Sequence, residues 1–140
     1  MTMPTRTAAT MANKAEPSPA DPRRRAAERR GHGAETFAAW ALRLKGYRIL
    51  GRRVKTPHGE IDLVACKRDT VAIIEVKARA DADAALSAVG PGTQRRLSAA
   101  ARVWLARHPA YAGHTIRFDV VMVVPRRWPA HLVNAFAATD

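Results

Sequence analysis

Four polar residues in the first two thirds of the chain have the types and spacing of a metal-assisted hydrolytic site. Asp62 lies in one predicted strand, and Glu75 and Lys77 lie in the next. Successive strand residues face opposite sides, so Glu75 and Lys77 share one face. Glu35 sits at the margin of the apolar arc of a predicted helix and can look toward the core; the arc consists of Phe37, Ala38, Ala41, Leu42 and Leu44. Carboxylate oxygens suit Mg²⁺ or Mn²⁺, and a neighbouring lysine can contact a scissile phosphate or an attacking water.

The register of the hairpin decides whether the two strand acids meet. A short loop centred on Arg68-Asp69 pairs residues whose numbers sum to 137, as 68 and 69 do, and so places Asp62 opposite Glu75. A slip of one residue would turn the two side chains to opposite faces. The same register pairs Glu60 with Lys77, and it pairs Leu63 with Ile74 and Ile61 with Val76 on the apolar face.

Two carboxylates facing each other across a hairpin repel. At about 5 Å and an effective dielectric constant near 20, the repulsion is roughly 3 kcal/mol. A favourable cross-strand pair contributes only about 0.2–1 kcal/mol. Either a shared proton or a bound cation must therefore relieve the contact between Asp62 and Glu75.

The alternative interpretation treats Glu75-Val76-Lys77 as an ordinary polar strand end. The scarcity of acids argues against it, because only eight occur between Gly31 and Ala135 in a chain of net charge +12. Three of the eight lie in predicted turns or loops. Placing the others on a helix and within apolar strands is hard to explain as a solubility feature.

The elements that must position these residues follow from hydrophobic periodicity and turn signals. Arg23-Arg24-Arg25 and Arg29-Arg30 lead into a first helix, which ends near Lys45, before Gly46. The predicted strands cover residues 47–54, 60–66, 71–77 and 116–124, with a short edge strand at 131–136. A second helix covers 93–108, after a loop at 81–92 with helical character at 84–89. The order α-β-β-β-α-β(-β) predicts an α/β sandwich.

Composition limits the domain count and the partners. Residues 1–22 contain four prolines and few large apolar residues, which predicts a disordered tail before one domain at 23–140. No apolar run approaches the roughly 20 residues of a membrane span, and the single Cys66 suits a reducing cytoplasm. The net charge of +12 and pI of 11.3 favour a polyanionic partner such as nucleic acid, although a ribosome-associated protein would look similar.

Several arginines are candidates for phosphate contacts. The second predicted helix has a cationic side, which is either a solvated face or a phosphate-binding one. Arg79 extends the face of Lys77, and the arginines before the first helix offer further contacts. The predicted nucleic-acid-binding residues are Arg29, Arg30, Arg79, Arg95 and Arg96.

Five other residues have alternative interpretations. Trp40 and Trp104 fall at helical core spacing, so we expect them to be structural. Trp128 follows two arginines and either stacks on a base or packs at a turn, and packing is favoured. Asp119 lies inside an apolar strand as the partner of an arginine or as a residue that orients the site, and orientation is favoured. His58 is the histidine expected nearest the acids.

Six motifs in order along residues 28–136 resemble the YraN family of uncharacterised bacterial proteins. That family is assigned to the PD-(D/E)xK nuclease superfamily and likened to Holliday-junction resolvases. The motifs are Gly31-x-x-Ala34-Glu35-x-x-Ala38, Gly46-Tyr47-x-Ile49-Leu50, Gly59-Glu60-Ile61-Asp62-Leu63, Glu75-Val76-Lys77-x-Arg79, Gln94-Arg95-Arg96-Leu97 and Arg117-Phe118-Asp119-Val120-Val121.

The resemblance implies a restriction-endonuclease-like core, with a central mixed sheet flanked by helices. It implies Glu35 as the helical acid, Asp62 as the main metal ligand, and Glu75 with Lys77 as the signature pair. Gln94 is implied as an auxiliary residue. The chain departs from the pattern at Arg53, where the family often has Asn, and in the stretch before Gln94, where Gly90, Gly92 and Thr93 replace a more usual lead-in.

The sequence favours a metal-dependent endonuclease that hydrolyses phosphodiester bonds in DNA, branched or otherwise structured. Asp62, Glu75 and Glu35 would hold Mg²⁺ or Mn²⁺, and Lys77 would act on water or phosphate. One alternative is a nucleic-acid-binding module that keeps the fold without turnover. Another is a ribosome- or envelope-linked adaptor. The oligomeric state stays open, with a homodimer among the options.

Overall fold

The protein is described by a computed structural model that covers residues 22–81, 83–84 and 89–139, with side chains from residue 33 onward in those ranges. The compact unit that carries the sheet begins at Gly31. The predicted disordered tail at 1–22 lies almost entirely outside the described residues, and so does most of the helical stretch expected at 84–89. Both stay predictions.

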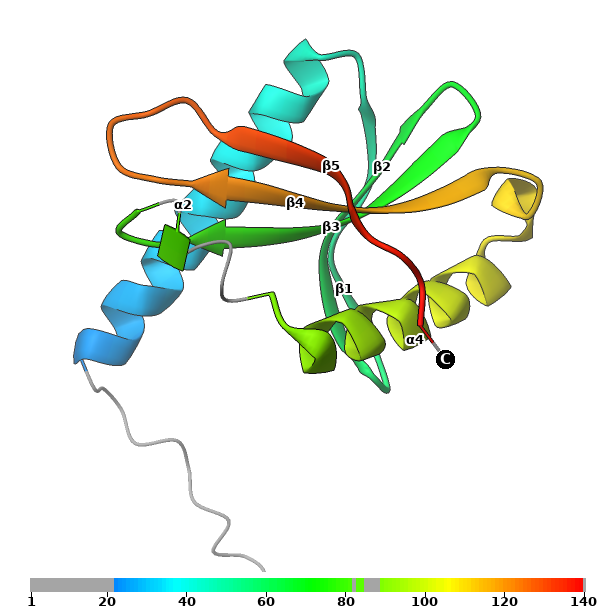
Figure 1. The fold of residues 1–140 in the computed structure, drawn as a ribbon, viewed down its shortest axis with the longest axis horizontal. Coiled ribbons are helices and arrows are strands. Elements are labelled where there is room, and N and C mark those ends of the chain that lie inside the picture. The colour runs from blue at the N-terminus through cyan, green and yellow to red at the C-terminus, as the bar shows by residue number, and fades with distance from the viewer. Residues whose placement is uncertain (1–21, 82, 85–88, 140) are drawn as a thin grey trace, which may run out of the picture. The chain divides into compact units, whose positions relative to one another are not determined.

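A five-stranded sheet in the order β1-β2-β3-β4-β5 forms the centre of this unit (Figure 1). The predicted element order is confirmed, and the predicted bounds of the strands and the second helix agree with the structure within two residues. The first helix begins earlier than predicted, at Pro22, and so includes the arginines that were expected to precede it. The elements are α2 (Pro22–Leu44), β1 (Arg48–Thr56), β2 (Gly59–Lys67), β3 (Thr70–Ala78), α4 (Pro91–Arg107), the 3-10 turn η1 (Pro109–Tyr111), β4 (Thr115–Val123) and β5 (Ala130–Phe136).

The sheet is mixed because its two halves are connected differently. β1, β2 and β3 form an antiparallel meander. Its first turn ends at Gly59, which has a φ of +112°, a backbone conformation that glycine adopts without steric strain. Its second turn contains Arg68, which has a φ of +57°. β4 then pairs parallel to β3 after the chain crosses over through α4, and β5 returns antiparallel to β4.

Each face of the sheet packs against one helix. On one face, Ile73 of β3 belongs to a core cluster with Leu97 and Trp104 of α4. On the other face, the next residue, Ile74, packs in a cluster with Leu42 of α2. Alternation along β3 thus divides its side chains between two apolar layers. No helix in the described part of the chain is long and apolar enough to cross a membrane.

Helix α2 contacts the sheet through small residues, which corrects part of the predicted core. Ala38 is fully buried, whereas Phe37 is 37% exposed, Leu44 is 73% exposed and Trp40 is 57% exposed. The predicted apolar arc placed Phe37 and Leu44 toward the core and treated Trp40 as structural, and these assignments were wrong. Alanines let the helix approach the sheet closely beside the buried Leu42, so Phe37, Trp40 and Leu44 remain on the outer side.

The other two tryptophans divide between core and surface. Trp104 is 1% exposed and is part of the core cluster under α4, so its structural role is confirmed. Trp128 is 60% exposed in the loop between β4 and β5, although packing at a turn was the favoured expectation. Its ring contacts the ring of Phe37 edge to face, with centroids 5.4 Å apart.

Candidate active site

Asp62 and Glu75 meet where β2 and β3 separate. The ladder between these strands runs from Lys67↔Thr70 to Leu63↔Ile74, which confirms the predicted register over those pairs. One residue further, Asp62 accepts a hydrogen bond from the backbone N–H of Val76 through Oδ2, at 2.8 Å. The carboxyl groups of Asp62 and Glu75 are also hydrogen-bonded to each other. The two acids therefore meet, as predicted, although the ladder ends one pair before them. The predicted pairing of Ile61 with Val76 on the face of Leu63 was wrong, because the strands separate there and Ile61 packs in the α4 cluster while Val76 packs against the α2 cluster.

The electrostatics of this pair are unfavourable without a cation. Burial, followed by the charge of Glu75 and the hydrogen bond to it, raises the pKa of Asp62 to about 8. Glu35 adds a smaller effect in the same direction. Near neutral pH the pair therefore holds a shared proton, which is one of the two ways to relieve the repulsion between facing carboxylates.

Two cations contact one oxygen of Glu75, whose side chain is 5% exposed. Lys77 Nζ lies 3.5 Å from Glu75 Oε2, and Arg96 Nη2 donates to the same oxygen at 3.0 Å. Arg96 Nη1 also donates to the backbone carbonyl of Glu60 at 2.7 Å. Arg96 was predicted to bind phosphate from the surface of the second helix. In the structure it links that helix to Glu75 and to β2, and its contact with phosphate stays a prediction.

The turn before β2 leaves room for Arg96. A Cβ atom built on Gly59 would lie 2.9 Å from Cδ of Arg96, so a larger residue there would push the arginine aside. His58 lies in the same turn, is exposed, and donates its backbone N–H to Thr56 Oγ1 at 3.0 Å. The turn therefore serves the candidate site chiefly by leaving space for Arg96.

Glu35 approaches the pair from α2 but has its own partner. It is buried, and Arg53 Nε donates to its Oε1 at 2.8 Å. Arg53 adopts a left-handed backbone conformation, with φ of +49°, that Asn accepts more readily than other non-glycine residues. In the described ranges, no three His, Cys, Asp or Glu side chains are grouped closely enough to hold a metal together.

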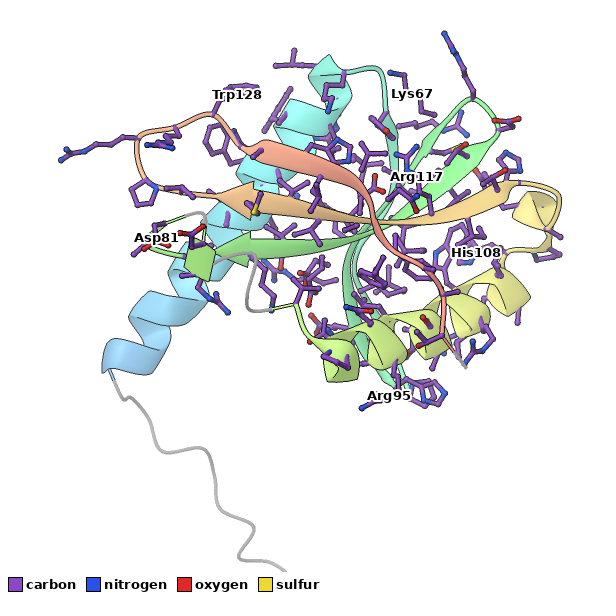
Figure 2. The ribbon with its side chains drawn as sticks, viewed as in Figure 1. Lys67, Asp81, Arg95, His108, Arg117 and Trp128 are labelled. Carbon is purple, nitrogen blue, oxygen red and sulfur yellow. The ribbon has the colours of Figure 1, made fainter. Side chains whose placement is uncertain are left out.

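The remaining predicted residues lie around this centre or outside the described side chains. Gln94 is half-buried in the first turn of α4, where its backbone N–H bonds the carbonyl of Gly90. Arg79 is exposed at the end of β3, and Arg95 projects away from the sheet (Figure 2). Arg29 and Arg30 belong to α2, but their side chains are outside the described set, so their role stays a prediction.

Asp119 belongs to a separate buried network rather than to the candidate site. It accepts hydrogen bonds from Arg117 Nη2 at 2.7 Å, His131 Nε2 at 2.7 Å and the backbone N–H of Asn134 at 2.9 Å. Arg117 also donates to the hydroxyl of Tyr47 at 2.6 Å. The arginine-partner interpretation of Asp119 is confirmed, and the favoured one, an orienting residue, was wrong.

Sequence reasoning missed two parts of the site, the inward turn of Arg96 and the pairing of Arg53 with Glu35. The spacing of Arg96 on the second helix marked it as cationic, but the reach of a long side chain depends on the tertiary packing around it. The departure from Asn at position 53 was visible in the sequence. It became informative only once the positive φ and the contact with Glu35 were known.

Comparison with known proteins places the chain in a family. The model of the uncharacterised protein family UPF0102 matches residues 34–123. A UPF0102 protein of Chelativorans sp. (strain BNC1) is 56% identical over 115 residues, which cover 82% of this chain and 93% of the relative. A UPF0102 protein of Rhodopseudomonas palustris (strain BisA53) is 54% identical over 127 residues, or 90% of this chain and 98% of the relative.

The matched region contains Glu35, Asp62, Glu75 and Lys77. The match also confirms the family resemblance drawn from the six motifs, since UPF0102 and YraN denote the same family. The chain therefore belongs to the uncharacterised protein family UPF0102.

Proposed function

We propose that this protein is a divalent-cation-dependent nuclease that cuts DNA, with Asp62, Glu75 and Lys77 at its centre. The observation that carries the proposal is the contact between two carboxyl groups, one of them almost fully buried, beside a lysine 3.5 Å from Glu75. Such a pair is costly for stability alone, because like charges are brought together out of water. Its retention in so basic a chain supports a functional role.

The donor set fits a hard divalent ion. Asp62 and Glu75 supply carboxylate oxygens, which Mg²⁺ and Mn²⁺ prefer. Glu35 would join them by exchanging its ion pair with Arg53. A divalent ion held there would supply charge neutralisation for a phosphodiester and would lower the pKa of water.

The protein's own side chains have distinct roles in this proposal. Lys77 would hold its ammonium group against the phosphate, where negative charge develops. Arg96 would keep the Glu75 carboxylate in place through the same oxygen that Lys77 contacts. Gln94, in the first turn of α4, would orient the substrate. Arg79 and Arg95, both exposed, would contact the phosphate backbone and fix the register of the strand.

The assignment of this α/β fold to the restriction-endonuclease-like class is part of the same proposal. A helix, a three-stranded meander, a crossover helix and a parallel fourth strand occur in the order expected for a restriction-endonuclease-like core. Signature acids on the second and third strands, with a lysine two residues after the second acid, support that assignment. We propose branched or otherwise structured DNA as the substrate and the cytoplasm as the location, in line with the basic charge and the single free Cys66.

A second candidate is a nucleic-acid-binding module without turnover. The observation that favours it is the ion pair between Glu35 and Arg53, which occupies the expected third ligand. In this version the basic surface binds DNA, and the acid pair is a remnant of the catalytic centre.

Titration of Mg²⁺ and of Mn²⁺ against linear duplex, single-stranded, flap and four-way-junction DNA separates the candidates. The nuclease proposal predicts cleavage that Glu75→Gln reduces by about a hundredfold or more, while Asp69→Asn in an exposed turn leaves it unchanged. DNA binding without cleavage of any of the four would favour the binding module. Equal cleavage by the Glu75→Gln variant would exclude the proposed centre.

A further inference from the structure

An aromatic surface lies on the outer side of α2 and on the loop after β4. Phe37, Trp40 and Trp128 form this surface, which we call the aromatic platform. Trp40 and Trp128 are 57% and 60% exposed, and the edge-to-face contact with Phe37 supports the Trp128 ring. Figure 2 shows Trp128 in the β4–β5 loop beside α2. Two indole rings left on the surface of one small unit mark a binding surface.

The platform is surrounded by cationic side chains. The guanidinium of Arg43 lies 5.2 Å from the ring centroid of Trp40. Arg126 and Arg127 are exposed and immediately precede Trp128. The chain contains no acid in residues 36–59 or 120–139, the stretches that supply both indoles. The partner that complements this surface must therefore be anionic and must also offer flat apolar faces.

We propose that the aromatic platform binds single-stranded nucleic acid, with unpaired bases stacked on Trp40 and Trp128 and with phosphates on the flanking arginines. Single strands combine regular negative charge with exposed aromatic faces. A duplex offers the charge, but its bases are stacked inside. An acidic peptide or a lipid surface would match the arginines and leave the two indoles without a stacking partner.

A cavity next to Trp128 adds a recess to this surface. It has a volume of about 250 Å³, with Leu42 and Val121 among its lining residues and with Lys45 and His131 as its charged or polar members. Pockets for drug-sized ligands are about 300–1,000 Å³. The cavity is therefore suited to one ring system that leaves the strand beside Trp128, rather than to a complete dinucleotide cofactor.

The platform lies at the same end of the sheet as the candidate active site. β3 and β4 run parallel, with Lys77 opposite Met122, and the N–H of Arg79 bonds the carbonyl of Val123 at 3.3 Å. The loop that carries Trp128 thus begins beside the end of β3. On α2, Trp40 follows Glu35 by five residues, which is about 7.5 Å along the helix axis and roughly 140° around it, so the two side chains leave different faces of the helix. An unpaired strand that reaches both the acids and the platform must therefore wrap around α2, and this part of the inference rests on the proposed nuclease function.

The test compares a labelled oligothymidylate with a duplex of the same length, bound to the full chain in EDTA so that no cleavage occurs. Trp40→Ala and Trp128→Ala should each weaken single-strand binding by about fivefold to 150-fold, the range for loss of one base stack. Duplex affinity should change by less than about twofold, because the arginines that meet its phosphates remain. Leu132→Ala, which removes another exposed apolar side chain, is the matched control.

Intrinsic fluorescence gives a second measurement. The oligonucleotide should quench the wild-type emission, and the Trp40→Phe, Trp128→Phe double variant should lose that response because its one remaining tryptophan, Trp104, is buried. Equal losses for single strand and duplex, or no loss for either, would overturn the proposal. So would a shift from dimer to monomer in the Trp128→Ala variant, because the platform would then be a contact between copies.

Failure of this inference is distinguishable from failure of the nuclease proposal. If the wild-type protein binds single strands through Trp40 and Trp128 but cleaves none of the substrates, the nuclease proposal is rejected and the platform proposal is retained. Cleavage that depends on Glu75, with single-strand affinity unchanged in both tryptophan variants, would retain the nuclease and reject the platform.

Discussion

The protein contains two buried acid sites whose electrostatics are opposite. Asp119 is fully buried and accepts hydrogen bonds from Arg117, His131 and the backbone of Asn134. Burial alone would raise its pKa, but the hydrogen bonds from His131 and Arg117 outweigh that effect and lower the pKa of Asp119 to about 2. At the other site, burial and the charge of Glu75 raise the pKa of Asp62 to about 8.

The difference shows which acid is structural. Asp119 has positive or polar donors on every side, and its network joins β4 to β5 and to Tyr47. His131 completes that network, because the Lys45 ammonium can only donate to its Nδ1, which leaves Nε2–H to donate to Asp119. Glu75 instead has Lys77 and Arg96 at one of its oxygens, whereas the partners of Asp62 are the backbone N–H of Val76 and the facing carboxyl group of Glu75. A cation between them would correct that imbalance, whereas Asp119 needs none.

The largest expected effect is the loss of the Asp119 charge. Asp119→Asn keeps the size of the side chain but leaves Arg117 without its counter-charge, so unfolding should become easier by about 3–5 kcal/mol. Urea denaturation measures the change, with Asp69→Asn in the exposed β2–β3 turn as the control. A loss below about 1 kcal/mol would show that the network does not hold β4 and β5 together.

The pH dependence of the wild type should show the same network. Because folding lowers the pKa of Asp119, its contribution is complete above its unfolded pKa near 4 and is lost as the pH falls toward about 2. That loss should be roughly 2–3 kcal/mol, the free-energy equivalent of lowering the pKa of Asp119 from near 4 to about 2. The Asp119→Asn variant should not show this loss of stability at low pH. If its stability falls equally steeply, other carboxyl groups cause the loss in the wild type.

Asp62→Asn should have the opposite effect and raise the free energy of unfolding. In EDTA it removes one of two facing carboxyls and keeps an acceptor for the N–H of Val76, so stability should rise by about 1–3 kcal/mol. Since folding raises the pKa of Asp62, the gain should be absent near pH 4 and grow as the pH rises toward about 8. Paired denaturation curves at pH 4 and pH 9 provide the test, and a destabilised variant at pH 9 would contradict it.

The smallest effect is expected at Arg53, the partner of Glu35. Arg53→Asn loses a partly exposed ion pair, worth up to about 1 kcal/mol. It also relieves part of the left-handed backbone cost, which is roughly 1–2 kcal/mol for most residues. The net change should stay within about 1 kcal/mol, whereas Arg53→Val should be clearly destabilised. A large loss in Arg53→Asn would make this arginine as structural as Arg117.

The positions of the acids could be predicted from the sequence because they depend on local rules. Alternation along the strands and a two-residue turn set the hairpin register up to Leu63 and Ile74, and this register brings Asp62 next to Glu75 where the strands separate. The outer face of α2 was not predictable in this way. Its alanines and its large residues are both apolar, and only the close approach to the sheet decides that Trp40 stays outside.

The surroundings of the acids depend on contacts between distant segments. The donors of Asp119 come from β4 and β5, and a register shift opposite Asp119, with Asn134 at φ +56°, turns a backbone N–H toward it. The path of Arg96 from α4 to Glu75 requires the open space at Gly59. Such partners lie far apart in sequence, and no periodic pattern indicates them.

Calorimetric titration of Mn²⁺ and Mg²⁺ into the DNA-free protein tests the central claim most directly. The wild type should bind the ion between Asp62 and Glu75, and Asp62→Asn should weaken that binding by at least about tenfold, while Asp69→Asn leaves it unchanged. The folded, more stable Asp62→Asn variant keeps the comparison free of unfolding. Equal affinity in the wild type and Asp62→Asn would show that the acid pair is not the cation site.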